Sequence, residues 1–334
     1  MKVLITGGAG YIGSTVAHSF VDKKHEVTII DNLINGSISN IPKKCNFIKC
    51  DIGDVKSLRK LVLTKHDIVL HFAALIDNQE SLAKRDLYLD NNYTKSKIFF
   101  NFCIERGMKN FIFSSTAAVY GKSNVAVDER SKTKPLSPYG QSKLKFENFL
   151  KKSEKNINYV ILRYFNVAGV ETKMRCGFKI QNNKSLFSNL CRSYHGTTKF
   201  NIYGKNFNTN DGTAVRDFIY ISDLSEIHYK FSLAIVKKKL RLVVNCGYGH
   251  GYSVMDIIKK LKDISKKNFY YVFKKRRKND IEYSVANTDQ LNKLYDIQFN
   301  NDKLKIILKT SLLWHEKFSK NIEKTNRKII LQKN

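Results

Sequence analysis

The sequence lacks long apolar runs and closely spaced cysteine pairs. In its 334 residues, no hydrophobic stretch approaches the length of about 20 residues that a helix needs to cross a membrane. The chain starts directly on a strand pattern, without the apolar core of a signal peptide. Its six cysteines form no CxxC pair, so neither a zinc site nor a disulfide framework is indicated. We therefore expect a cytoplasmic protein without a bound metal or a membrane partner.

Acidic residues are also scarce, with 59 Lys and Arg against 29 Asp and Glu, which gives a net charge of +30. The stretch "FKKRRK" at 273–278 would suit a nucleic-acid-binding patch. However, lysines are spread over nearly every predicted helix, together with many Asn and Ile residues, which indicates a compositional bias rather than one basic face. A chain this basic binds polyanions nonspecifically at low salt. We expect no specific nucleic-acid partner.

Glycines are concentrated at the start of the chain, in "MKVLITGGAGYIGS". Residues 2–6 form a short apolar strand pattern, glycines follow at 7, 8, 10 and 13, and residues 14–23 form a helical pattern. A strand, a glycine turn and a helix in this order bring bare backbone N–H groups and the positive end of a helix dipole against a phosphate. The opening predicts a site for a pyrophosphate.

A second apolar strand, at 26–30, ends at Asp31. Its distance from the glycines is that of an acid that binds the adenosine ribose hydroxyls of a dinucleotide. A carboxylate there would repel a 2′-phosphate, and no arginine follows directly. The pattern therefore favours NAD over NADP.

Strand and helix patterns alternate through the first half of the chain. Further strands are predicted at 45–51, 67–74 and 109–115, and helices at 55–63 and about 80–105. This alternation predicts an α/β fold, with a Rossmann-type doubly wound parallel sheet and a smaller C-terminal substrate-binding domain. We place the NAD-binding domain at 1–165, with later segments returning to it, a mainly substrate-binding domain at 166–316, for which the resemblance described below implies a UDP-sugar, and a basic tail at 317–334.

A tyrosine and a lysine lie four residues apart in "SPYGQSKLKFE", at the start of a helix that Ser137 and Pro138 favour. Tyr139 and Lys143 therefore lie on one helix face. Tyrosine has a pKa of about 10, and bringing it to about 7 requires about 4 kcal/mol of stabilisation of the phenolate. A nearby ammonium group and an oxidised nicotinamide ring both favour the phenolate. With Thr116 placed after the fifth strand, the pattern predicts a catalytic site.

Several motifs carry a resemblance to a known family. "TGGAGYIGS", "DNLING", "HFAA", "SSTAAVYG", "SPYGQSK" and "RYFNVAG" resemble the extended short-chain dehydrogenase/reductase superfamily. "DGTAVRDFIYISDL", "NCGYGHGYSV" and "RRKND" narrow the resemblance to the UDP-glucose 4-epimerase family within it. The likeness runs from about residue 2 to about residue 316.

The resemblance implies a role for each residue that matches a family motif. The implied catalytic residues are Tyr139, Lys143 and Thr116. The implied cofactor contacts are Gly7, Gly10, Tyr11, Ile12, Gly13, Asp31, Asn32, Asn35, Asp51, Ile52, Phe72, Ala73, Asn91, Ser114, Tyr139, Lys143 and Tyr164. The implied contacts to the UDP-sugar are Thr116, Tyr139, Asn166, Asn182, Arg216, Arg277, Asp280 and Ser284. The segment 179–187, which contains Asn182, matches the family poorly.

The implied activity is NAD-dependent 4-epimerisation of UDP-hexoses through a transient 4-keto sugar, and the implied assembly is a homodimer. In the family, the residue four positions after the matched Asp280 borders the 2-position of the sugar, and a small residue there admits a 2-acetamido group. Ser284 is small and predicts that N-acetylated UDP-hexoses are also substrates. A shift of the alignment by one residue would place Tyr283 there instead and exclude them.

Two alternative functions remain. One is a nucleotide-sugar dehydratase or another NAD-dependent enzyme that modifies nucleotide sugars. A dehydratase uses the same scaffold, but that family has Asp and Glu directly after the threonine, where this chain has Ala117 and Ala118. A non-enzymatic NAD- or polyanion-binding protein is the other alternative, and it gives no reason to keep Tyr139, Lys143 and Thr116 together.

Overall fold

A computed structural model describes residues 1–61, 63, 65–153, 157–179, 185–196, 198–265, 270–295 and 302–331. Its main feature is a seven-stranded sheet with the order β10-β6-β5-β4-β1-β2-β3, in which every neighbouring pair is parallel. The strands are β1 (Lys2–Thr6), β2 (Glu26–Asp31), β3 (Asn46–Lys49), β4 (Ile68–His71), β5 (Asn110–Thr116), β6 (Asn158–Tyr164) and β10 (Arg241–Cys246).

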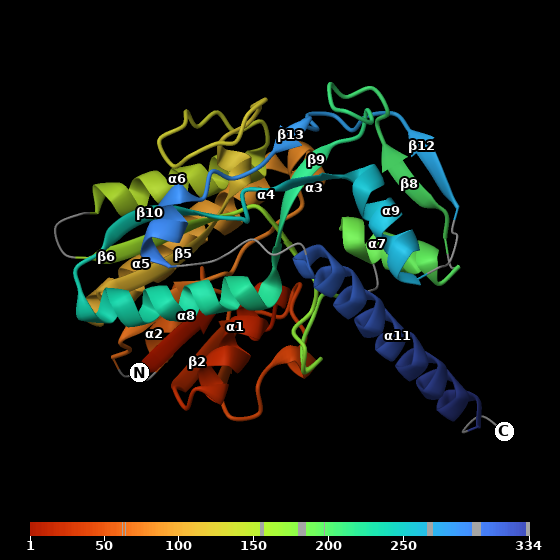
Figure 1. Ribbon diagram of the computed structural model, residues 1–334. Coiled ribbons are helices and arrows are strands. Elements are labelled where there is room, and N and C mark those ends of the chain that lie inside the picture. Colours follow the sequence, from red (N-terminus) through yellow and green to blue (C-terminus); the bar gives the residue numbers. More distant parts are fainter. Residues whose placement is uncertain are drawn as a thin grey trace.

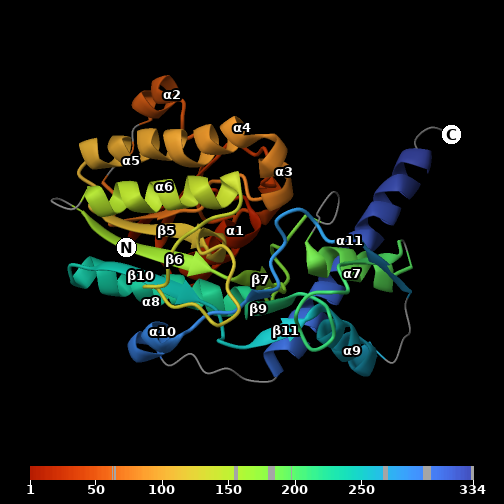
Figure 2. The same cartoon turned by 90° about the horizontal axis from the view of Figure 1, so that it is seen from above.

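Helices cover both faces of this sheet (Figures 1 and 2). The helices on one face are α1 (Tyr11–Asp22) and α8 (Ile221–Lys237). Those on the other are α2 (Val55–Lys60), α5 (Lys95–Glu105) and α6 (Pro138–Lys152). The predicted Rossmann-type doubly wound sheet is confirmed.

Burial on both faces explains why the first strand is apolar at successive positions. Val3 and Ile5 point into a core that includes Phe20 of α1, while Leu4 points into a second core that includes Phe99 of α5. Neighbouring residues of a strand point to opposite faces, so a strand between two helical layers needs apolar side chains throughout.

The chain leaves β1 toward β2 and β3 in one direction and returns at β4 to build the sheet in the other. Ligands of such sheets bind at the carboxyl ends of the strands where the order reverses. The glycine turn after β1 and the residues after β4 lie at this point.

The predicted helix at 80–105 is interrupted. It consists of α3 (Asn78–Ala83), α4 (Arg85–Leu89), the π-helical turn η2 (Asp90–Thr94) and α5. Asn92 lies in η2 and is buried, and its side chain accepts from the backbone N–H of Leu75 at 2.8 Å and donates to the Leu75 carbonyl at 2.9 Å. This tertiary contact fixes the irregular turn, which hydrophobic spacing alone could not predict. The other predicted boundaries differ by a few residues, since α1 begins at Tyr11 and α2 ends at Lys60.

A second region contains the smaller sheets. One sheet joins β7 (Asn166–Ala168), β9 (Val215–Tyr220), β11 (Gly251–Ser253) and β13 (Tyr283–Ser284), and β8 (Phe200–Tyr203) pairs with β12 (Tyr271–Lys274). The remaining elements are η1 (Ile38–Asn40), η3 (Ala117–Val119), α7 (Leu186–Tyr194), α9 (Val254–Ser265), α10 (Asp289–Leu294) and α11 (Asp302–Leu331). Because α8 and β10 come from the second half of the chain and pack in the main layers, the chain passes between the two regions more than once. Helix α11 continues across residue 317, and its end lies away from the other elements (Figures 1 and 2).

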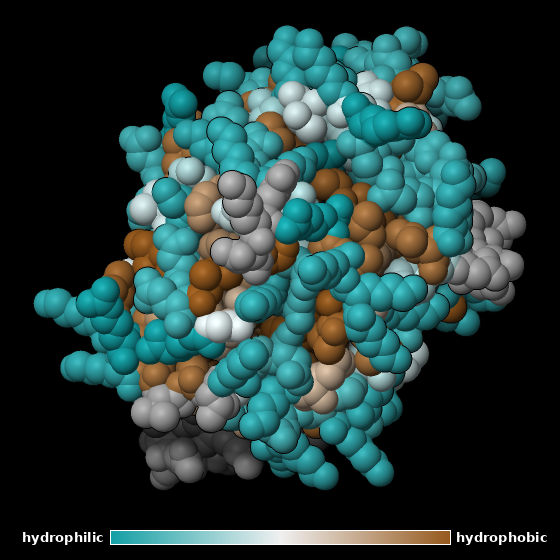
Figure 3. Space-filling model, turned by 90° about the vertical axis from the view of Figure 1, so that its left-hand side faces the viewer, coloured by the Kyte–Doolittle hydropathy of each residue, from teal (hydrophilic) through white to brown (hydrophobic). Residues whose placement is uncertain are grey.

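Hydrophilic side chains cover most of the face drawn in Figure 3, with separate hydrophobic patches between them. Within the described ranges, we find no helix whose length and apolarity would let it cross a membrane.

Candidate active site

The glycine turn after β1 is closely packed against the end of β4. A Cβ atom on Gly7, whose φ is +69°, would lie 2.6 Å from the backbone nitrogen of Ala73, and one on Gly13 would lie 2.3 Å from the Gly7 carbonyl oxygen. Gly10 precedes α1 and has no side chain that could cap the N–H groups in the first turn of that helix. The helix N-terminus therefore presents backbone donors to an anion, as a dinucleotide diphosphate requires.

Asp31 lies at the end of β2 and is held against this turn. Its carboxylate accepts from the backbone N–H of Ala9 at 3.0 Å and of Leu33 at 2.7 Å. Only 8% of Asp31 is exposed. The position beside the glycine turn fits an acid that accepts hydrogen bonds from a ribose.

Asp51, after β3, is surrounded by donors. It accepts from Asn32 Nδ2 at 2.9 Å, from the Gly53 N–H at 2.8 Å and from Lys95 Nζ at 3.1 Å. Burial raises the pKa of Asp51, but these hydrogen bonds outweigh it and hold the pKa below its usual range. Lys95 was not among the predicted site residues, because nothing in the sequence connects a lysine of α5 with an acid after β3.

Tyr139 and Lys143 lie at the start of α6, as predicted. The helix begins as the sequence indicates, with the Ser137 hydroxyl accepting from the Gly140 N–H at 3.1 Å and Pro138 in its first turn. Both side chains are buried, and Lys143 Nζ donates to the carbonyl of Ser114 at 2.8 Å. The helix thus carries its two polar side chains to the carboxyl end of β5.

The environment of this pair shifts both pKa values. Burial raises the pKa of Tyr139 to about 12, and a hydrogen bond from Thr116 acts in the opposite direction. Burial lowers the pKa of Lys143 to about 7, and the carboxylate of Glu147 opposes that shift. Desolvation is the reason for both shifts, since it disfavours the charged forms of both residues.

The sequence reasoning missed a buried ion pair beneath the site. Glu147 is fully buried and Arg163 is 2% exposed. Arg163 donates to the two oxygens of Glu147 at 2.6 and 3.0 Å, and the Ser115 hydroxyl donates to the same carboxylate at 2.5 Å. The signal in the sequence was the spacing, because Glu147 follows Lys143 by four residues and Tyr139 by eight on one helix face.

The second region supplies cationic and amide side chains. Arg216 of β9 donates to the Asp280 carboxylate at 2.7 Å, and the guanidinium of Arg277 lies 3.8 Å above the ring of Tyr203. Asn166 donates to the backbone carbonyl of Asp217 at 3.2 Å, across the β7–β9 pair. Tyr203 was not predicted.

Strand β13 gives the orientation of Tyr283 and Ser284. Ser284 is paired with Arg216 in the parallel register, and Tyr283 with Val215. A Cβ atom on Gly251 would contact Val215 at 2.5 Å and the Tyr283 ring at 3.9 Å. Tyr283 therefore points to the Gly251 side, while Ser284 shares a face with Arg216. The strand also lies beside the segment after Thr116, since Ser123 forms a β-bridge with Tyr283, and several residues between 117 and 127 line one small cavity together with residues 283–285.

The remaining predicted residues lie around the same strand ends. Tyr11 and Ile12 begin α1, Phe72 and Ala73 follow β4, and Tyr164 ends β6. Tyr164 forms a hydrogen bond with His228 at 2.6 Å. Three further residues are Asn35, which is exposed after β2, Ile52, which is buried after β3, and Asn91, which lies in η2. The prediction for Asn182 lies outside the described residues.

All six cysteines are free thiols. In the part of the chain that the structure describes, no three His, Cys, Asp or Glu side chains gather in a way that could hold a metal ion.

Comparison with known proteins places this arrangement in a family. Residues 3–247 match the NAD dependent epimerase/dehydratase family. The chain belongs to that family. The expected NAD cofactor and the resemblance are thereby confirmed, and the glycine turn with Asp31 fits such a cofactor.

Relatives within the family extend over nearly the whole chain. A UDP-glucose 4-epimerase of Azospirillum brasilense is 35% identical over 327 residues, which is 96% of this chain and 94% of the relative. A solved UDP-glucose-4-epimerase of Stenotrophomonas maltophila, with bound NAD and formylated UDP-arabinopyranose, is 28% identical with a TM-score of 0.90 and covers 96% of this chain and 99% of that one. The UDP-Glc/GlcNAc 4-epimerase of Campylobacter jejuni is 33% identical with a TM-score of 0.79, over 95% and 99% of the two chains.

Proposed function

We propose that this chain catalyses the NAD-dependent 4-epimerisation of UDP-hexoses, interconverting UDP-galactose and UDP-glucose through a transient 4-keto sugar. The observation that carries the proposal is the group of two buried side chains, Tyr139 and Lys143, with the half-buried Thr116 at the end of β5. It lies in a sheet whose glycine turn fits a dinucleotide. The UDP-glucose 4-epimerases similar to this chain over nearly its full length support the same reaction.

In this mechanism Tyr139 takes the proton of the sugar 4-hydroxyl and later returns it, as a general base and then a general acid. Thr116 shares the hydrogen bond, and Lys143 would hold the nicotinamide ribose and supply positive charge to the phenolate. Bound oxidised NAD would supply a hydride acceptor for C4 and a second positive charge near Tyr139. With a pKa of about 7, Lys143 is partly protonated at neutral pH, so its charge is available for this role.

The UDP group would be held by the second region. Arg216 and Arg277 would supply charge to the diphosphate, Asp280 would accept a ribose hydroxyl, and Asn166 would contact the sugar-nucleotide. The ion pair between Arg216 and Asp280 already holds two of these groups together. An anchored UDP leaves the hexose free to turn and present its other face, which epimerisation requires.

A dehydratase is the main enzymatic alternative. It needs an acid to expel a hydroxyl, and the positions after Thr116 are Ala117 and Ala118. Mass analysis of the product separates the two functions. Incubation with UDP-galactose alone should give a sugar nucleotide of unchanged mass that co-elutes with UDP-glucose, whereas a product that has lost water would show a dehydratase.

The non-enzymatic alternative is tested by Tyr139→Phe. For an epimerase, the variant retains NAD but loses turnover. For a protein that only binds NAD or a polyanion, the variant keeps its full function in the cell.

We also propose that N-acetylated UDP-hexoses are substrates. Ser284 shares a face with Arg216, which supports the register that places a small residue beside the 2-position of the sugar. The comparison of kcat/KM for UDP-galactose and UDP-N-acetylgalactosamine decides the point. We expect similar kcat/KM values for the two substrates. Ser284→Tyr should reduce kcat/KM only for the acetylated substrate. A ratio above about 10³ that Tyr283→Ala abolishes would show that Tyr283 faces the sugar.

We further propose a homodimer formed through α5 and α6, in the cytoplasm. The two helices pack side by side on one face of the sheet through Phe100, Phe146 and Phe149. Free thiols are typical of a reducing compartment. Light scattering of the purified protein tests the dimer, and a monomer at micromolar concentration would contradict it.

A further inference from the structure

A segment that we call the strap, residues 169–178, follows β7 and lies between α1 and α11. Its first residue contacts the start of α1, where the Tyr11 hydroxyl donates to the carbonyl of Gly169 at 2.5 Å. Tyr11 follows Gly10 directly, at the helix N-terminus that faces the predicted diphosphate. One end of the strap is therefore tied to the glycine turn.

The other end of the strap is tied to the same turn through Asn40. This side chain is 7% exposed, and its amide donates to the carbonyls of Gly177 at 3.2 Å and Ala9 at 3.3 Å. Ala9 lies within the glycine turn itself. The two ends of the strap thus contact residues on either side of Gly10, one through the Tyr11 hydroxyl and the other through Asn40.

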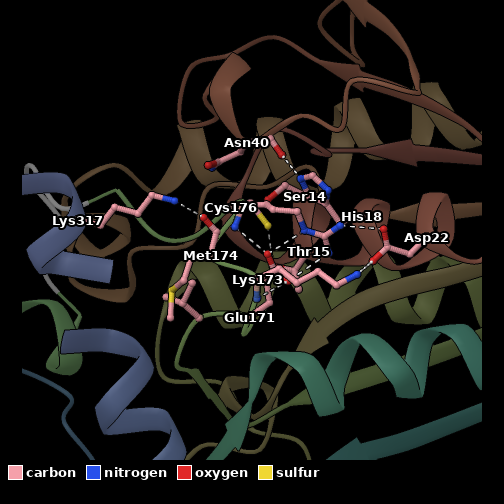
Figure 4. Close-up of polar contacts among 12 residues, drawn as sticks. Ser14, Thr15, His18, Asp22, Asn40, Glu171, Lys173, Met174, Cys176 and Lys317 are labelled. Atoms are coloured by element: carbon pink, nitrogen blue, oxygen red, sulfur yellow. Dashed lines mark hydrogen bonds and ion pairs between the residues drawn. The ribbon is translucent and has the colours of Figure 1, made fainter. Parts of the chain in front are cut away.

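The middle of the strap is joined to α1 by charged side chains (Figure 4). Arg175 donates to Glu171 through two nitrogens at 3.1 Å each, and through a third nitrogen to Asp22 of α1 at 2.8 Å. Lys173 contacts Asp22 at 2.8 Å. The Lys173 side chain is 62% exposed, against 30% for Arg175 and 9% for Glu171. Solvent therefore weakens the lysine pair more than the arginine contacts.

Asp22 is the last residue of α1, where a carboxylate meets the negative end of the helix dipole. The hydrogen bonds from Arg175 and then Lys173 lower the pKa of Asp22 to about 2. The carboxylate is consequently charged at any pH at which the protein would work, and the contact between strap and helix is an ion pair throughout that range.

Helix α11 supports the strap from the other side. Trp314 Nε1 donates to the carbonyl of Phe178 at 2.9 Å, and Lys317 Nζ donates to that of Met174 at 2.8 Å. The strap is held between α11 and α1, so it has little room to move while Arg175 keeps its contacts.

We propose that Arg175 is a positioning residue for the cofactor, which acts through the strap to hold the glycine turn closed on NAD and so slows NAD release. An anion site made of backbone N–H groups binds well only while those groups keep their positions. Arg175 joins the middle of the strap to α1. The two ends of the strap contact Tyr11 directly and Ala9 through Asn40, on the two sides of Gly10. The proposal concerns NAD retention alone and does not depend on which sugar is converted.

The test measures exchange of bound NAD for isotope-labelled NAD in the purified full-length protein, without any UDP-sugar. Because charge-assisted hydrogen bonds are the strong ones, Arg175→Gln should exchange at least about tenfold faster than the unchanged protein. Arg175→Lys keeps the positive charge but loses the forked guanidinium group. Its exchange rate should lie between those of the unchanged protein and of Arg175→Gln. Lys173→Gln is the matched control, which removes one exposed contact to the same Asp22, and should change the exchange less than about twofold.

Thermal unfolding of the NAD-free variants distinguishes positioning from general stability. We expect Arg175→Gln to exchange NAD faster than Lys173→Gln. The difference in exchange rate should be larger than the difference between the unfolding midpoints of the two variants explains. Equal exchange in the variant and the unchanged protein, or equal acceleration in both variants, would overturn the proposal. If Arg175→Gln does not fold, Asp22→Asn removes the negative charge that Arg175 contacts at the end of α1 and leaves the contacts to Glu171 in place. Unchanged exchange in that variant would overturn the proposal as well.

Discussion

Replacing Glu147 by glutamine removes the buried negative charge beneath the catalytic pair at almost constant volume. Arg163, which is 2% exposed, would lose a partner that it contacts at 2.6 and 3.0 Å. Breaking a buried pair from one side costs about 3–5 kcal/mol, because a charge is left in the interior without compensation. Since whole domains are stable by about 5–15 kcal/mol, this single change should remove a large fraction of the free energy of unfolding.

The same substitution should also change the pH dependence of turnover. Burial lowers the pKa of Lys143 to about 7, and the Glu147 carboxylate opposes that shift. Without the carboxylate, the pKa of Lys143 falls further, so the lysine loses its proton at a lower pH. Because the charged lysine favours the phenolate of Tyr139, the alkaline decline of kcat should move to lower pH.

Urea unfolding and a pH–rate profile measure the two effects. Lys151→Gln is the control, since Lys151 is 36% exposed and contacts the same carboxylate at 3.7 Å. That variant should change the free energy of unfolding by less than about 1 kcal/mol. A similarly small change in the free energy of unfolding for Glu147→Gln, with an unshifted pH profile, would refute the reasoning. The pair of Glu147 and Arg163 would then neither stabilise α6 nor support the charge of Lys143.

Three further predictions concern the catalytic pair, the cofactor and acid stability. Tyr139→Phe and Lys143→Ala should each reduce turnover at least about a hundredfold in steady-state assays, and near-normal rates would remove that residue from the mechanism. Denaturing the purified protein should release NAD in near-stoichiometric amount by chromatography, whereas recovery of NADP would contradict the interpretation of Asp31. Burial lowers the pKa of His71 to about 3, so the folded protein keeps it neutral while the unfolded chain takes up a proton below about pH 6.5. Its contribution to stability is therefore complete above that pH and is lost as the pH falls toward 3. In urea unfolding across this range, the free energy of unfolding of His71→Gln should fall less steeply than that of the unchanged protein.

The sequence was sufficient for the features that depend on local patterns. The glycine turn, the acid at the end of β2 and the helix start at Ser137 each follow from short-range geometry. Tyr139 and Lys143 share a helix face because of their spacing alone. The parallel sheet follows from the alternation of strands and helices, since the crossover between parallel strands is usually a helix.

The contacts between distant segments could not be predicted in the same way. Lys95 meets Asp51 from another element, and Arg163 meets Glu147 from a neighbouring strand. The high pKa of Tyr139 depends on how completely folding removes water from it, which no spacing reveals. The interruption of the helix at 80–105 similarly depends on the contact between Asn92 and Leu75.

The transfer of hydrogen at C4 tests the proposed reaction most directly. The purified protein, without added NAD or reductant, is incubated with UDP-galactose that carries deuterium at C4, and the products are examined by mass spectrometry and NMR. We predict UDP-glucose that retains deuterium at C4, with no NADH released into solution, because the hydride leaves and returns within one turnover. UDP-glucose without the label, stoichiometric release of NADH, or no conversion by a protein that holds NAD would contradict the proposed mechanism.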